Sequence, residues 1–178
     1  MKALKSFSHV FAGTVMLLML HVTVKAQSPK LTDPEIASVA VTANQIDIDN
    51  ANIAKEKSKN ADVQKFAQTM IADHQSVIDQ AVALVKKLNV TPKDNNVSKK
   101  LMSDAKKTQA SLRSKSGSDF DKAYVSNEVA YHKAVISTVN NVLIPQAQNA
   151  ELKKLLQSVA PVLKTHLEHA EMVQKNLK

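Results

Sequence analysis

The sequence has 178 residues and a formal net charge of +8, with no cysteine and a single arginine, Arg113. The lack of cysteine excludes disulfide bonds, thiolate metal sites and thiol catalysis. Nucleic-acid sites use arginine forks and stacked aromatic rings, whereas here the charge is scattered lysine and aromatic residues make up 3% of the chain, so we expect no nucleic-acid partner.

The beginning of the chain has the pattern of a secretory signal peptide. Two lysines come first, residues 10–20 form an apolar run, and residues 24–26 place small side chains at the positions that a signal peptidase reads. The run is too short to span a bilayer comfortably, which favours cleavage over an uncleaved anchor, and no later stretch is apolar enough to span one. We predict a signal peptide at residues 1–26 and a single domain at residues 27–178. A periplasmic location follows, with secretion or loose association with the outer membrane as alternatives.

Apolar residues spaced three and four apart predict four long helices. The first has Asp33 as its expected N-terminal cap and Pro34 at its first helical position, and it ends in the charged run 55–59. The second is expected to be capped by Asn60 and to stop at Asn89.

A long connection follows, with a shorter and weaker helix expected over residues 97–114. The third long helix is expected to begin at Ser118 or Asp119 and to be ended by a proline. The fourth covers about residues 149–177, and Pro161 inside it is expected to produce a kink.

No segment has the alternating pattern of a β-strand, so we predict an all-α protein. Two long helices stand on each side of the long connection that contains the shorter helix. This is the layout of a ferritin-like four-helix bundle with one long crossover.

Each long helix places one titratable side chain in its apolar series: Asp47, His74, His132 and His166. Asp47 and His74 are almost equally far from the turn near residue 60, so we expect them at one level; the height of the other two relative to them stays open. Imidazole is the commonest nitrogen ligand of zinc, copper and iron, and a carboxylate can complete the site. The pattern therefore predicts one transition-metal ion held by the three histidines, with Asp47 as fourth ligand or as the group that orients a ring.

Three further residues are auxiliary candidates: Asp73 beside His74, Glu128 one turn before His132, and His169 one turn after His166. Either carboxylate could orient a ring from outside the ligand shell. The alternative is that the histidines form a buried polar network that fixes helix pairing, with no metal and no catalysis, in a structural or interaction module of the cell envelope. The partner of such a module is unknown from the sequence.

Three segments carry a family resemblance: residues 63–74 with the Asp73–His74 pair, residues 120–124 followed by His132, and residues 166–170. Together they resemble a bacterial family of exported, ferritin-like proteins of unassigned function that are often described as outer-membrane or periplasmic proteins. The resemblance covers the chain from about Asp33 onward and implies a fold and a location, but no activity.

Enzymatic activity is not assigned. Di-iron bundles use several inward glutamates and paired Glu-x-x-His motifs, and no glutamate here is followed by histidine three residues later. We therefore expect neither ferroxidase activity nor iron storage. An enzyme of another kind would need an open coordination position or a cleft.

Overall fold

The computed structural model describes residues 30–177, so the predicted signal peptide lies outside the described residues. Within this part of the chain every regular element is helical, which confirms the prediction of an all-α bundle. The elements are α1 (Asp33–Lys57), α2 (Ala61–Lys87), α3 (Asn96–Arg113), α4 (Gly117–Thr138), the π-helical turn η1 (Val139–Leu143), α5 (Ile144–Gln146) and α6 (Ala150–Asn176).

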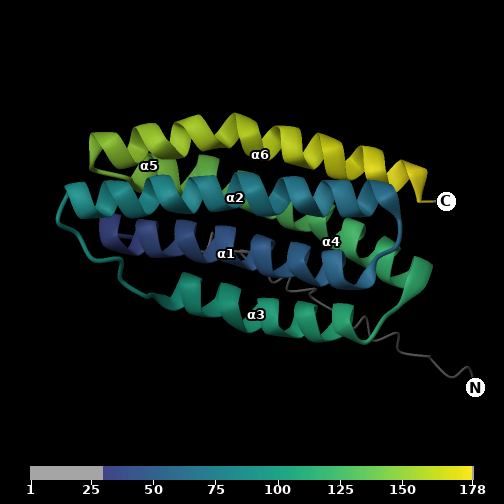
Figure 1. Cartoon of the computed structure of the whole chain (residues 1–178). Helices are drawn as coiled ribbons and strands as arrows, with labels where there is room; N and C mark the ends of the chain where they lie inside the picture. The colour runs from purple at the N-terminus through teal and green to yellow at the C-terminus, as the bar shows by residue number, and fades with distance from the viewer. Residues whose placement is uncertain (1–29, 178) are drawn as a thin grey trace, which may run out of the picture.

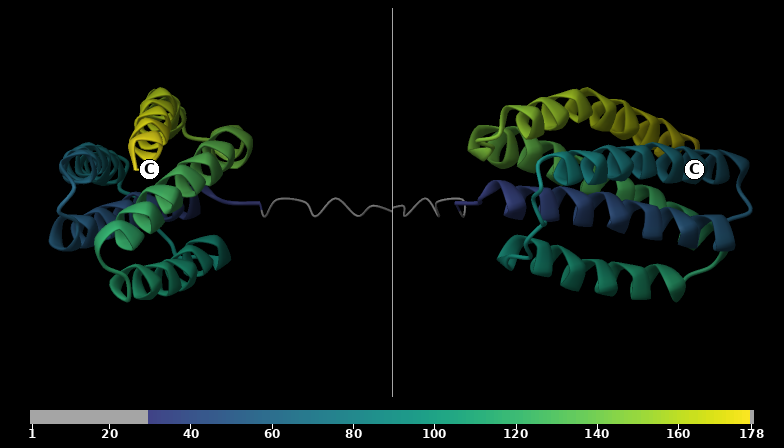
Figure 2. Two further views of the ribbon diagram at one scale, coloured as in Figure 1. Left: turned by 90° about the vertical axis from the view of Figure 1, so that its right-hand side faces the viewer. Right: turned by 60° about the vertical axis from the view of Figure 1, so that its left-hand side comes forward.

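The helices form two antiparallel hairpins joined by the crossover. α1 and α2 make the first hairpin, α4 and α6 make the second, and α2 lies beside α6 (Figure 1). α3 packs along α1 on the side away from α2 and α6, so the shorter helix expected in the crossover is a fifth packed helix (Figure 2). None of the helices in the described region combines the length and the apolar composition needed to cross a bilayer.

The N-terminus of α1 differs by one residue from the prediction. Thr32 is the cap, not Asp33, and its backbone N–H and hydroxyl donate to the Glu35 carboxylate at 2.9 and 2.7 Å. Asp33 instead accepts hydrogen bonds from the backbone N–H groups of Gln148 and Asn149, both at 2.8 Å. The beginning of α1 is thereby tied to the turn that precedes α6.

The two ends of the third long helix also differ from the prediction. Ser116 is the cap and Gly117, with φ of +55°, is the first residue, in place of a start at Ser118 or Asp119. The helix does not stop before Pro145 but widens into η1 and continues as α5. Proline lacks an N–H and its ring clashes with the carbonyl four residues back, which accounts for the widened turn.

The start of α2 and the course of α6 are closer to expectation. The Asn60 side chain accepts from the N–H groups of Asp62 and Val63 at 2.9 and 3.2 Å, which confirms it as the cap. α6 continues through Pro161 without a break, and its ribbon is bent along its length (Figure 2).

The core consists of two apolar clusters at opposite ends of the bundle. One contains Phe66, Phe120 and Tyr124, and the other contains Ile36 and Leu156. A layer of buried polar side chains separates the clusters, made of Asp47, Asn50, His74, Glu128, His132 and His166.

Candidate metal centre

Four helices bring the four predicted ligands to one level of the bundle: Asp47 from α1, His74 from α2, His132 from α4 and His166 from α6. The ring centroids lie 5.8 Å apart for His74 and His132, 5.1 Å for His74 and His166, and 5.5 Å for His132 and His166. All four residues are at most 3% exposed, so the cluster belongs to the interior.

The relative height of His132 and His166, which the sequence left open, follows from where the helices end. His132 lies fourteen residues before Gln146, where α5 ends, and His166 lies sixteen residues after Ala150, where α6 begins. A difference of two residues is about 3 Å along a helix, which two imidazole side chains can bridge.

Each of the three rings donates one hydrogen bond to the protein from one of its nitrogens. Because the acceptors are oxygens, the bonded ring nitrogen must carry the hydrogen, and this defines the tautomer of each neutral ring. The pairs are His74 Nδ1 with Asn44 Oδ1 (2.7 Å), His132 Nδ1 with the backbone oxygen of Glu128 (3.0 Å), and His166 Nε2 with Asp73 Oδ2 (2.9 Å).

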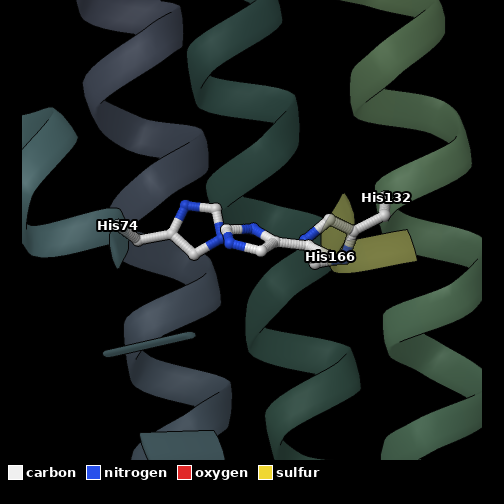
Figure 3. A group of neighbouring side chains, drawn as sticks. All are labelled: His74, His132 and His166. Carbon is white, nitrogen blue, oxygen red and sulfur yellow. The ribbon is translucent and has the colours of Figure 1, made fainter. Parts of the chain in front are cut away.

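The second nitrogen of each ring is buried and has no hydrogen-bond partner: Nε2 of His74, Nε2 of His132 and Nδ1 of His166. In the neutral form of each ring this atom has a free lone pair, since the proton is on the other nitrogen. One nitrogen from each ring lies within 4.8 Å of the other two, and Figure 3 shows the rings converging from three helices. Metal-binding histidines have the same arrangement: one ring nitrogen binds the ion, and the other donates an outer hydrogen bond that orients the ring.

Asp47 lies against two of these nitrogens. Its Oδ2 is 3.3 Å from Nε2 of His74 and 3.6 Å from Nε2 of His132. Ligands at 2.0–2.1 Å from a tetrahedral ion are about 3.3 Å apart, so these two distances are close to the spacing of ligands around one ion. Neither Asp47 oxygen accepts a hydrogen bond from an N–H group, but the Glu128 carboxyl group lies beside Asp47 and can hydrogen-bond to it when one of the two is protonated.

Burial sets the charge of the cluster. It raises the pKa of Asp47 to about 8, and burial together with the charge of Asp47 raises the pKa of Glu128 well above its usual value. Burial, with a contribution from neighbouring histidines, lowers the pKa of His74 to about 3 and that of His132 to about 4. At neutral pH His74 and Asp47 are therefore not an ion pair, and these imidazoles are in the neutral form that binds metals.

Two of the auxiliary candidates lie elsewhere than their position in the sequence suggests. Asp73 does not orient its neighbour His74; it accepts the hydrogen bond from His166 on the opposite hairpin. His169 lies outside the cluster, where its ring meets Phe66 edge-on with the centroids 5.1 Å apart.

The third auxiliary candidate, Glu128, is close to the centre. Its Oε2 lies 3.7 Å from His132 Nδ1, and it forms a second group of possible ligands with Asp47 and His132 within 4.8 Å. Asn44 was not predicted as a partner of His74, because α1 carries several asparagines and only the packing of α1 on α2 selects this one.

The fold and the site together define an all-α bundle with a buried layer of three histidines and two carboxyl groups. The chain belongs to a known family: the model of the domain of unknown function DUF4142 matches residues 21–173. This agrees with the resemblance in one respect, that the function of the family is unassigned.

One solved structure similar to this chain is that of CopM in the Cu(II)-bound form, with a TM-score of 0.61 and 17% sequence identity. The alignment covers 82% of this chain and 98% of CopM. At this identity the likeness shows the fold alone. No curated protein matches the sequence.

Proposed function

We propose that this chain is an exported, ferritin-like helical bundle that binds one transition-metal ion in its interior. The proposed ligands are His74, His132 and His166, with Asp47 as the fourth and Glu128 beside it. The periplasm is the proposed location, on the basis of the signal-peptide pattern at residues 1–26.

The observation that carries the proposal is the set of three buried ring nitrogens without hydrogen-bond partners. Buried polar atoms are nearly always paired, because leaving one unpaired costs about 1–3 kcal/mol. A single cation between the rings would satisfy all three lone pairs, together with an oxygen of Asp47.

The donor set narrows the choice of ion. Imidazole nitrogen suits zinc, copper, iron and nickel, and the sequence has no cysteine to favour softer ions. CopM, a structural neighbour, has been solved with Cu(II), which makes copper the first ion to test. We expect Cu²⁺ to bind more tightly than Zn²⁺, as it does at most nitrogen and oxygen sites.

The alternative function is a structural or interaction module of the envelope in which the histidines only fix helix pairing. The hydrogen bonds from the rings to Asn44, Asp73 and the Glu128 carbonyl favour it, because each ring is already anchored on one side. The unpaired ring nitrogens on the inner side of the cluster do not fit this alternative, because a buried polar network stabilises a core only when each member has its hydrogen-bond partners.

The test compares His74 of α2, which is a proposed ligand, with His169 of α6, which lies outside the cluster. Residues 27–178 are purified without a histidine tag, stripped with a chelator, and dialysed against Cu²⁺ or Zn²⁺. We expect about one ion per chain by elemental analysis, and loss of that ion in His74→Ala. His169→Ala is the matched control, because it removes an imidazole that lies outside the cluster, and it should bind as the wild type does.

Circular dichroism checks that each variant is folded, and His74→Gln replaces the alanine variant if that one is not. A wild-type protein that retains no ion, and whose melting curve does not change with either metal, would contradict the proposal and support the polar network.

A further inference from the structure

A cavity of about 270 Å³ lies on one side of the polar layer, between α1, α2, α3, α4 and α6. It occupies the half of the bundle that contains the Ile36 and Leu156 cluster. Its walls are mainly aliphatic, and they include Val77, Ala81, Val135, Val139 and Leu163.

The cavity is too large to be a packing defect. Protein interiors are packed about as densely as organic crystals, with few voids larger than a water molecule. An apolar cavity of about 150 Å³ already binds benzene. The present cavity therefore has room for a molecule larger than one benzene ring.

One end of the cavity is polar. Asp47, Asn50, His74 and His132 line it, and each is at most 3% exposed. The proposed metal accounts for the unpartnered atoms of the histidines and of Asp47, but not for Oδ1 of Asn50, which is also buried without a partner. This oxygen is inaccessible even to a water molecule, so a molecule in the cavity meets the apolar walls and gains no hydrogen bond from it.

Solvent can be reached from the cavity on the side of α3. Its lining includes two exposed residues, Asp104 of α3 and Ala134 of α4, among walls that are otherwise buried or half-buried. This is where we place the entrance.

We propose that the cavity is a binding site for a small, uncharged, apolar molecule. The molecule packs against the aliphatic walls. This contact does not use the metal, so the site operates in the metal-free protein.

Indole and benzofuran are suitable probes, because both are uncharged, mainly apolar and larger than one benzene ring. Titration calorimetry on metal-free residues 27–178 is expected to show saturable binding of both at one site.

Ala81→Leu places extra side-chain volume in the cavity and should weaken the binding of both probes at least tenfold, since both lose their apolar contacts. Ala83→Leu is the control, because Ala83 is exposed on the same helix and does not line the cavity. Ala105→Leu fills the cavity from α3 and serves if the first variant does not fold.

The absence of saturable binding, or unchanged binding in a folded cavity-filling variant, would overturn the proposal. Because metal content is measured separately, none of these results depends on whether the metal site is real.

Discussion

At the scale of single residues, Asp47 decides the charge of the interior. Its pKa is about 8 in the folded protein, against an ordinary value of 3.8, because burial disfavours the carboxylate. The folded state therefore holds this proton more tightly than the unfolded chain does. Through this group the metal-free protein loses stability as the pH rises from about 4 to about 8, with no further loss above the folded pKa.

We predict that Asp47→Asn, which imitates the protonated acid, becomes more stable relative to the wild type as the pH rises from 5 to 8. Melting temperatures of the two metal-free proteins at both pH values measure the effect. Asp79→Asn, at an exposed position of α2, should differ from the wild type in melting temperature by nearly the same amount at both pH values. A relative stability of Asp47→Asn that falls toward pH 8 would contradict a buried, protonated Asp47.

Much of the candidate site could be predicted from single positions. A histidine in an apolar helical series has to be buried, and three of them on three helices predicted a shared interior location. The hydrogen-bond partners could not be predicted in the same way, because Asp73 and Asn44 meet their histidines across helix interfaces. Such contacts depend on how each helix is rotated about its axis, and the residue spacing within one helix does not reveal that rotation.

At the scale of the helices, the N-terminal caps show where the sequence-based prediction was correct and where it was wrong. Asn60 was predicted correctly because asparagine before an apolar series is a strong cap signal. Thr32 was missed because Asp33 is an equally good cap residue one position later. The contacts of Asp33 with the turn before α6 select Thr32, and these contacts are far apart in the sequence.

We predict that Asn60→Ala lowers the free energy of unfolding by about 1 kcal/mol, since the N–H groups of Asp62 and Val63 lose their acceptor. Urea unfolding followed by circular dichroism measures the change. Asn52→Ala, at an exposed position inside α1, should be neutral or slightly stabilising, because alanine favours helix. Equal effects of the two substitutions would mean that the cap does not stabilise the protein.

The widening of the helix at η1 was not predictable from the pattern. Pro145 indicated the end of a helix, as it usually does. The chain instead accommodates the proline by forming a π turn whose Val139 and Leu143 remain in the core. Packing of these two side chains outweighs the local cost, and that balance is a property of the assembled bundle.

At the scale of the whole molecule, the polar layer lies between two apolar clusters that hold the ends of the bundle. The layer and the cavity both oppose folding in the metal-free protein. The walls of an unfilled cavity of about 270 Å³ lack the contacts that a packed interior would give them, which lowers the stability of the folded state. A bundle that retains both features is expected to gain stability from the ligands that occupy them.

We predict that Cu²⁺ at a free concentration of one hundred times its Kd raises the free energy of unfolding by about 2.7 kcal/mol, because only the folded chain presents the ligands together. Calorimetric melting with and without the ion measures the shift. His169→Ala should show the same shift, and His132→Ala should show none. A shift that persists in a folded His132→Ala variant would place the ion elsewhere.

The protonated carboxyl group of Asp47 has a consequence for ion loading. An ion that takes an oxygen of Asp47 as a ligand must displace the hydrogen that burial keeps there. Uptake of the cation then releases acid into the surrounding solution, and it becomes more favourable in alkaline medium. The bundle would thus exchange a proton for a metal cation, which limits the net charge that its interior has to accommodate.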